Sequence, residues 1–86
     1  MYEIQIENRC VRELKNLDKG VVRRAFEIIE TLLAKDPFSG KRLTGRYRGL
    51  FSFRFSDYRI VYEIRKARLV VVILRIRYRS DVYKGL

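Results

Sequence analysis

One segment constrains the fold of this chain more than any other: residues 51–62, FSFRFSDYRIVY. In its first half phenylalanine occupies every second position, and in its second half tyrosine and isoleucine do the same, with serine, valine or arginine between them. This period of two predicts two strands joined by a turn at Ser56-Asp57, each with one apolar face. The alternation places Arg54 and Arg59 on the opposite, open face.

A hairpin of this size is stable only if its apolar face is covered by another element. The cover that the sequence offers is a helical pattern between Val21 and Leu33, with Asp18 as its N-cap and Asp36-Pro37 as its end. A shorter helix, capped by Asn8, precedes it. The two helices are therefore expected to form a hairpin that packs on the sheet.

The remaining segments complete the sheet. Residues 37–49 are rich in Gly, Ser, Lys and Arg and are expected to form an exposed loop. Residues 69–74 are apolar without alternation, which is typical of a central strand covered on both faces. Arg75 and Arg77 interrupt this run, so the strand is expected to emerge into solvent there. Residues 79–84 are compatible with a strand or a helical turn.

We therefore predict one α+β domain over residues 1–86. Its sheet is mostly antiparallel and twisted, and the helical hairpin packs on one face. Residues 1–6, which alternate like a strand, pair beside a later strand.

The positive charge is concentrated in the second half of the chain. Residues 1–40 carry seven basic and seven acidic side chains, whereas residues 41–86 carry thirteen basic and three acidic ones. The whole net charge of +10 therefore lies in the later half. Such asymmetry points to a polyanionic partner, with nucleic acid as the first candidate and an acidic protein as the second.

The residue types that are missing exclude several classes of chemistry. The chain has no histidine, and its one cysteine, Cys10, follows the pattern of a buried residue, so nitrogen- and sulfur-ligated metals and His-dependent nucleophiles are excluded. Asp57, Glu63 and Asp81 stand singly among arginines, so we expect no metal and no cofactor. A lone cysteine and the absence of a leader or a membrane-spanning run favour the cytoplasm.

Arginine, lysine and tyrosine remain as candidates for chemistry. RNA carries its own nucleophile, the 2′-hydroxyl, so an enzyme that cleaves it needs to orient that group, neutralise charge on the phosphate and move two protons. Each candidate also has a structural interpretation. Arg54 and Arg59 are also compatible with ordinary solvated strand residues, Arg59 less so than Arg54, and Tyr83 is compatible with a packing residue that holds the C-terminus to the sheet.

The order of the elements and two motif segments resemble a known family. The segments are GLFSFRFSDYRIVYEI and LVVVILRIRYRSDVY, and with the order strand, helical hairpin, basic loop and three strands they resemble the RelE/ParE superfamily of small bacterial and archaeal toxins, in particular its RelE branch. The resemblance covers nearly the whole chain. It implies a fold like that of microbial ribonucleases and cleavage of mRNA in the ribosomal A site.

The resemblance also implies which residues form the site. The family's phosphate-binding arginine falls on Arg59, its late catalytic arginine on Arg77 or Arg79, and its C-terminal tyrosine on Tyr83. The expected RNA- and ribosome-binding residues are Lys41, Arg42, Arg46, Arg48 and Arg54.

At three positions the chain departs from the family's pattern. RelE proteins often carry basic residues where this chain has Leu50 and Ser52, and many relatives have histidine where Tyr78 stands. The resemblance therefore does not assign the general base.

The expected function is that of a toxin in a type II toxin–antitoxin system, acting as a ribosome-dependent endoribonuclease on mRNA. Its expected partners are a RelB-like antitoxin, mRNA and the ribosome with its ribosomal RNA. Oligomers are expected to form through the antitoxin, and no membrane contact is expected. The superfamily also contains ParE proteins that poison gyrase, so a non-enzymatic gyrase inhibitor or a plain RNA-binding module is the alternative.

Overall fold

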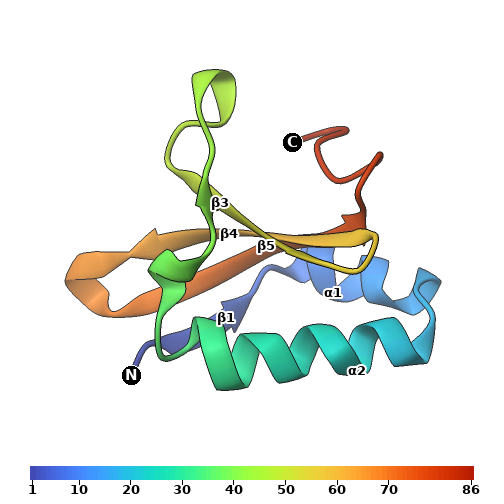
Figure 1. The fold of residues 1–86 in the computed structure, drawn as a ribbon, viewed down its shortest axis with the longest axis horizontal. Coiled ribbons are helices and arrows are strands. Elements are labelled where there is room, and N and C mark those ends of the chain that lie inside the picture. The colour runs from blue at the N-terminus through green and yellow to red at the C-terminus, as the bar shows by residue number, and fades with distance from the viewer.

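The computed structural model describes all 86 residues and is an α+β fold (Figure 1). Its sheet has five strands in the order β1-β5-β4-β3-β2, and only β1 and β5 run parallel. No helix is both long enough and apolar enough to cross a membrane. The main elements are β1 (Glu3–Ile6), α1 (Asn8–Glu13), α2 (Lys19–Ile28), β2 (Lys41–Arg42), β3 (Leu50–Phe55), β4 (Tyr58–Arg65) and β5 (Val70–Tyr78).

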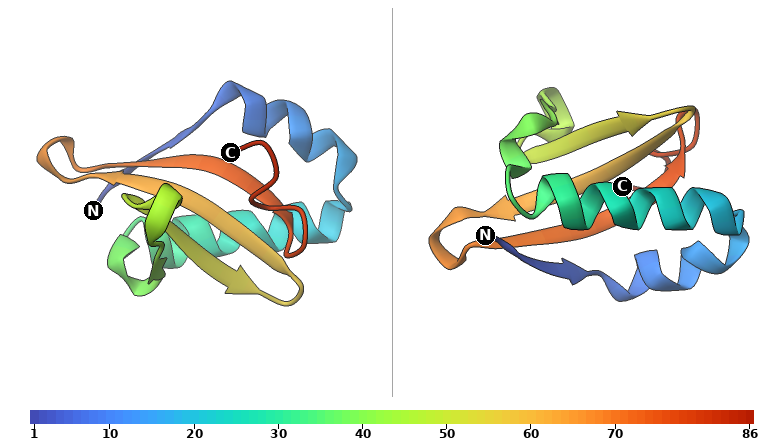
Figure 2. Two further views of the ribbon diagram at one scale, coloured as in Figure 1. Left: turned by 90° about the horizontal axis from the view of Figure 1, so that it is seen from above. Right: turned by 60° about the horizontal axis from the view of Figure 1, so that its bottom comes forward.

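The hairpin of β3 and β4 forms as the alternation predicts. Its register pairs Phe53 with Ile60 and Arg54 with Arg59, so the apolar and the cationic side chains separate onto two faces. Ser56 has a φ of 52° in the connecting turn. The apolar face, here the inner face, lies on the helices, and the opposite one is the outer face (Figures 1 and 2).

The helices cover the inner face because their apolar positions recur at helical spacing. Asp18 caps α2 as predicted, accepting a hydrogen bond from the Gly20 amide at 3.0 Å. A π-helical turn, Ile29–Leu33, extends α2 and keeps the same face buried. The predicted cap at Asn8 is wrong: Asn8 is already in α1, Glu7 is at the cap position, and no side chain caps that helix.

The core lies between α2 and the three long strands. The right-hand view of Figure 2 shows α2 lying across the sheet. Ile29, Ile60, Tyr62 and Ile73 are fully buried. The Tyr62 hydroxyl donates to the Pro37 carbonyl at 2.6 Å. Burial raises the pKa of Tyr62 to about 12, so this hydroxyl stays protonated and is a structural group.

An irregularity in β5 decides which way its arginines point. Tyr62 pairs with Ile73 and Val61 pairs with Arg75, so Leu74 is an extra residue without a partner on β4. The bulge shifts the alternation by one step and places Arg75 on the outer face. The expected emergence into solvent is wrong at this residue, because Arg75 is 1% exposed beneath the C-terminal segment.

The segment expected as an exposed loop, residues 37–49, is more ordered than predicted. It contains the edge strand β2, paired with β3, and two 3₁₀ turns, Pro37–Ser39 and Gly45–Tyr47. Pro37 is buried because its carbonyl meets Tyr62. The part after β2 rises on the side of the sheet away from the helices (Figure 1).

Candidate functional site

Three arginines cross the outer face in register. Arg54 on β3 stands opposite Arg59 on β4, and Arg59 stands opposite Arg77 on β5. We call these residues the arginine row. Opposed side chains on neighbouring antiparallel strands have Cβ atoms about 5 Å apart. The sheet thus places three arginine side chains next to one another on one face.

Two of the three members of the arginine row have no acidic partner. Neither Arg54 nor Arg59 makes an ion pair. Arg59 donates to the Ser52 hydroxyl and Arg54 to the Ser56 carbonyl, both at 3.3 Å. Like charges directly opposite one another destabilise a sheet, so this arrangement is favourable only when an anion binds there. Arginine presents a planar fork of donors that matches phosphate.

Arg77 and Arg79, the two candidates for the family's late catalytic arginine, lie in different places. Arg77 completes the row and is half-buried, and its guanidinium lies 3.7 Å from Glu13 of α1. Arg79 lies beyond the end of β5, where its amide donates to the Asp57 carbonyl in the hairpin turn, and its side chain is exposed. The structure therefore brings Arg77, and not Arg79, opposite Arg59.

Tyr83 lies in the C-terminal segment, residues 79–86, which forms turns on the outer side of the sheet (Figures 1 and 2). Its ring stacks on Tyr47 with centroids 5.2 Å apart, and its carbonyl accepts a hydrogen bond from the Tyr47 hydroxyl at 3.3 Å. No hydrogen bond is made by the Tyr83 hydroxyl. The segment passes over Arg75, next to the arginine row.

The residues predicted to bind RNA or the ribosome divide between the two faces. Lys41 pairs with Ser52 and shares the outer face with the arginine row. Arg46 lies over the Tyr47 ring in the neighbouring loop, at 5.7 Å. Arg42 pairs with Phe51 and stands over that ring at 5.6 Å, on the inner face. Arg48 is exposed and lines a shallow hollow together with Arg42, away from the row.

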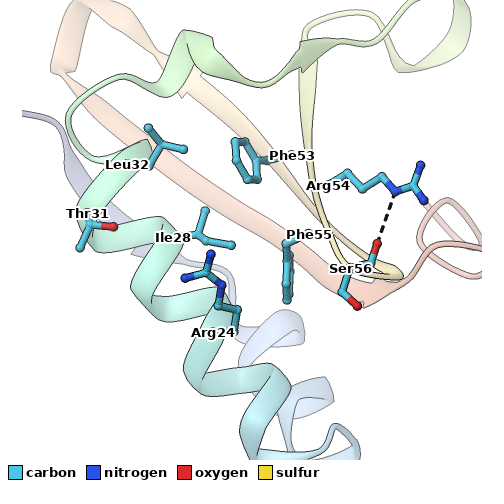
Figure 3. A pocket seen from close by; sticks show the side chains of 8 residues that line it. All are labelled: Arg24, Ile28, Thr31, Leu32, Phe53, Arg54, Phe55 and Ser56. Carbon is cyan, nitrogen blue, oxygen red and sulfur yellow. Dashed lines mark hydrogen bonds between the residues drawn. The ribbon is translucent and has the colours of Figure 1, made fainter.

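The largest hollow of the molecule lies elsewhere. It is a groove of about 450 Å³ between α2 and β3 (Figure 3). Its apolar side chains, Ile28, Leu32, Phe53 and Phe55, point toward one another, while Arg54 points away from them. The groove thus belongs to the inner face. Arg24, which also lines it, is paired with Glu27, and the arginine row lies on the other side of β3.

Two further residues, neither of which was predicted to belong to the site, contact the segment that carries Tyr83. Arg75 donates to two carbonyls of the C-terminal segment, and Tyr47 stacks on Tyr83. Burial lowers the pKa of Arg75 in spite of the opposite effect of the neighbouring Glu13, and the guanidinium remains charged because an arginine pKa is ordinarily far above neutral pH. No local pattern marks either residue. Tyr47 meets a partner 36 positions away, and Arg75 faces the C-terminal segment only because of the bulge at Leu74.

The cysteine is a core residue, as predicted. Cys10 is 1% exposed, and burial together with the nearby Glu13 raises the pKa of its thiol to about 11. Because a raised pKa keeps the thiol protonated well above neutral pH, we expect negligible alkylation by iodoacetamide at pH 8 in the folded protein and rapid alkylation in denaturant. Mass spectrometry of both samples checks this, and rapid labelling of the folded protein would contradict it.

The structure contains no cluster of acidic or thiol side chains that could hold a metal ion.

The comparisons with known proteins agree with one another. The sequence matches the family described as "ParE toxin of type II toxin-antitoxin system, parDE" over residues 4–83. It is 31% identical to Toxin RelG of Mycobacterium tuberculosis over 84 residues, which cover 96% of this chain and 97% of RelG.

Two solved structures share the fold. A chain of the RelBE2 toxin–antitoxin complex of Mycobacterium tuberculosis superposes with a TM-score of 0.85 and 30% identity, covering 91% of this chain and 98% of that one. A chain of the archaeal RelE–RelB complex of Pyrococcus horikoshii OT3 superposes with a TM-score of 0.69 and 28% identity, covering 94% and 98%. Fold, sequence and family match together establish that this chain belongs to the RelE/ParE family of toxins of type II toxin–antitoxin systems.

Proposed function

We propose that the protein is an endoribonuclease that cleaves mRNA in the ribosomal A site without a metal ion. The observation that carries the proposal is the pair of opposed arginines without acidic partners, Arg54 and Arg59, on the face where the segment bearing Tyr83 is held. A site of this kind offers charge to a phosphate and a free hydroxyl beside it, which is what phosphodiester cleavage by a 2′-hydroxyl requires.

The reaction needs little from the protein beyond position and charge. The 2′-oxygen bonds to the adjacent phosphorus and loses its proton, while the bond from phosphorus to the 5′-oxygen breaks and that oxygen gains a proton. The products are a 2′,3′-cyclic phosphate and a 5′-hydroxyl. Negative charge grows on the non-bridging oxygens in the transition state, and we assign its stabilisation to Arg59 with Arg77.

The role of Tyr83 is to orient the 2′-hydroxyl or to take part in proton transfer. The general base is not assigned. Basic groups of the loop, Arg46 and Arg48, and the ribosome itself are candidates for assistance.

Primer extension on a message incubated with the toxin, with and without translating ribosomes, tests the proposal. Cuts that are phased with the codons and appear only with ribosomes support it. Equal cutting of free RNA would contradict ribosome dependence. The alternative is a gyrase inhibitor, as the resemblance to ParE proteins implies, and an intact message together with trapped gyrase–DNA adducts would establish it. An intact message without adducts would indicate an RNA-binding module.

The charge on the outer face also leads to a prediction about how an antitoxin inhibits the toxin. The two relatives described above, from the RelBE2 complex and from the archaeal RelE–RelB complex, were solved together with an antitoxin. We expect an acidic or amphipathic antitoxin segment to cover the outer face here, because a protein of net charge +10 binds RNA indiscriminately when unpaired.

Filter binding of single-stranded RNA across a salt series checks this prediction. Log affinity of the free toxin should fall with log salt by about 0.7 for each phosphate contact. The purified toxin–antitoxin complex should lose most of both the affinity and the slope. If the complex cleaved message as fast as the free toxin, direct masking of this face would be wrong.

A further inference from the structure

The C-terminal segment has no regular secondary structure, yet four consecutive carbonyls in it accept hydrogen bonds from side chains. Arg75 Nη1 donates to the carbonyls of Val82, at 3.1 Å, and Lys84. The two carbonyls of Tyr83 and Gly85 accept from Tyr47 Oη and Arg9 Nη1, each at 3.3 Å. The donors come from β5, from the loop before β3 and from α1, so the segment is anchored to three parts of the fold.

Arg75 is the central anchor. Its side chain is 1% exposed, and its Nε lies 3.7 Å from Glu13 Oε1. A buried charge is tolerated only where it is paired and hydrogen-bonded, and the partners of this one are an acidic residue and the two carbonyls of the segment. Because the guanidinium has no access to solvent, it has no surface for an RNA phosphate.

The main-chain anchors bracket Tyr83 and leave its hydroxyl free. Arg75 holds the residues on either side of it, and Tyr47 holds its carbonyl and stacks on its ring with an interplanar angle of 28°. A chain terminus without such contacts is generally poorly ordered. The side chains of Arg75 and Tyr47 thus fix both the place and the tilt of the Tyr83 ring.

We propose that Arg75 and Tyr47 are positioning residues that hold Tyr83 beside the arginine row. The effect on cleavage rests on the proposed function, whereas the effect on the place of Tyr83 does not. Misplacing a catalytic group by about 1 Å costs on the order of 10²-fold in rate. Loss of either anchor should therefore slow the chemical step by misplacing Tyr83. Arg75 also shares Glu13 with Arg77, so Tyr47 is the anchor whose loss acts through Tyr83 alone.

The first experiment measures position without activity. Protein labelled with 3-fluorotyrosine gives one ¹⁹F resonance for each of its six tyrosines, assigned by Tyr→Phe variants. Arg75→Met should move the Tyr47 and Tyr83 resonances to the positions of the unfolded chain and leave buried Tyr62 in place. Arg65→Met is the matched control, because Arg65 pairs with Val70 at the other end of β5 and should change neither resonance.

If Tyr62 also lost its folded resonance in Arg75→Met, Tyr47→Leu would take its place. Tyr47 lies in a surface loop, so this variant removes the stack and the hydrogen bond while the core remains. An unchanged Tyr83 resonance in a folded variant that lacks either anchor would overturn the proposal.

The second experiment is a double-mutant cycle on programmed ribosomes, at saturating toxin and single turnover. We expect Tyr47→Leu, which leaves the pairs of Glu13 with Arg75 and Arg77 intact, to slow cleavage roughly 10- to 100-fold in the wild-type background and to have no further effect in Tyr83→Phe. A purely structural role would lower the melting temperature equally in both backgrounds and leave the rate of the folded protein unchanged, which would overturn the catalytic consequence. If the wild-type protein cleaved no message, the proposed function would fail, and the fluorine resonances would still decide whether the anchors place Tyr83.

Discussion

Arg59→Ala is expected to lower the single-turnover rate of mRNA cleavage at saturating toxin by roughly 30- to 1,000-fold, which corresponds to about 2–4 kcal/mol of transition-state stabilisation. Arg59 is the middle member of the arginine row and makes no ion pair. Its one side-chain hydrogen bond goes to the Ser52 hydroxyl at 3.3 Å, so its fork has donors left for a phosphate. The fold should survive, because the substitution removes a charge that faces two like charges. Thermal unfolding of the variant separates the two effects.

Two further variants act as controls for this result. Arg46→Ala removes a loop cation, and it should weaken ribosome binding and lower its salt dependence with little change of rate at saturation. Tyr83→Phe keeps the ring and its stack on Tyr47, and it should slow the chemical step while binding remains. Unchanged rates in both Arg59→Ala and Tyr83→Phe would remove the outer face from the chemistry.

The hairpin shows what local pattern can predict. Its two strands have unbroken alternation, so a single assumption, that the phenylalanines lie inside, fixes the face of every other residue. The structure confirms the face of Arg54, Arg59 and Tyr62 and the turn at Ser56-Asp57. The resemblance to the RelE/ParE superfamily rested on this hairpin, on residues 69–83 and on the order of the elements, and the family match over residues 4–83 confirms it.

β5 shows where local pattern fails. An unbroken alternation would put Ile73, Arg75 and Arg77 on one face, with the arginines against the core. The extra residue Leu74 reverses the phase, and nothing in an apolar run such as Val70–Leu74 marks the position of a bulge. Without the bulge in view, the only interpretation left for Arg75 was emergence into solvent, whereas the structure buries it.

The contacts around Tyr83 could not be predicted for a different reason. Tyr47 and Tyr83 are separated by 36 positions, and each lies in a segment without periodicity. Their stack depends on how far the loop before β3 rises above the sheet and on where the chain turns after β5. Both are consequences of the assembled fold, and no local signal in the sequence specifies them.

Ile73→Ala is expected to have the largest effect on stability. Ile73 is fully buried and lies between Ile6 of β1 and Tyr62 of β4. Truncating a buried isoleucine costs about 2–5 kcal/mol, because it removes apolar contact and leaves a cavity. A domain of 86 residues has a free energy of unfolding of roughly 4–13 kcal/mol, so this loss is a large share of the total. Urea denaturation followed by circular dichroism measures it.

The neighbouring residue supplies the control and links the result to function. Leu74 is the bulged residue and is partly exposed, so Leu74→Ala should cost about 1 kcal/mol or less. Equal losses in the two variants would mean that β5 does not bury Ile73 as described.

Ile73→Ala should still cleave message at the normal rate per folded molecule, because it leaves the arginine row and the anchors of Tyr83 intact. Arg59→Ala should show the reverse, a stable fold with little cleavage, and the two variants together assign the inner face of the sheet to stability and the outer face to chemistry.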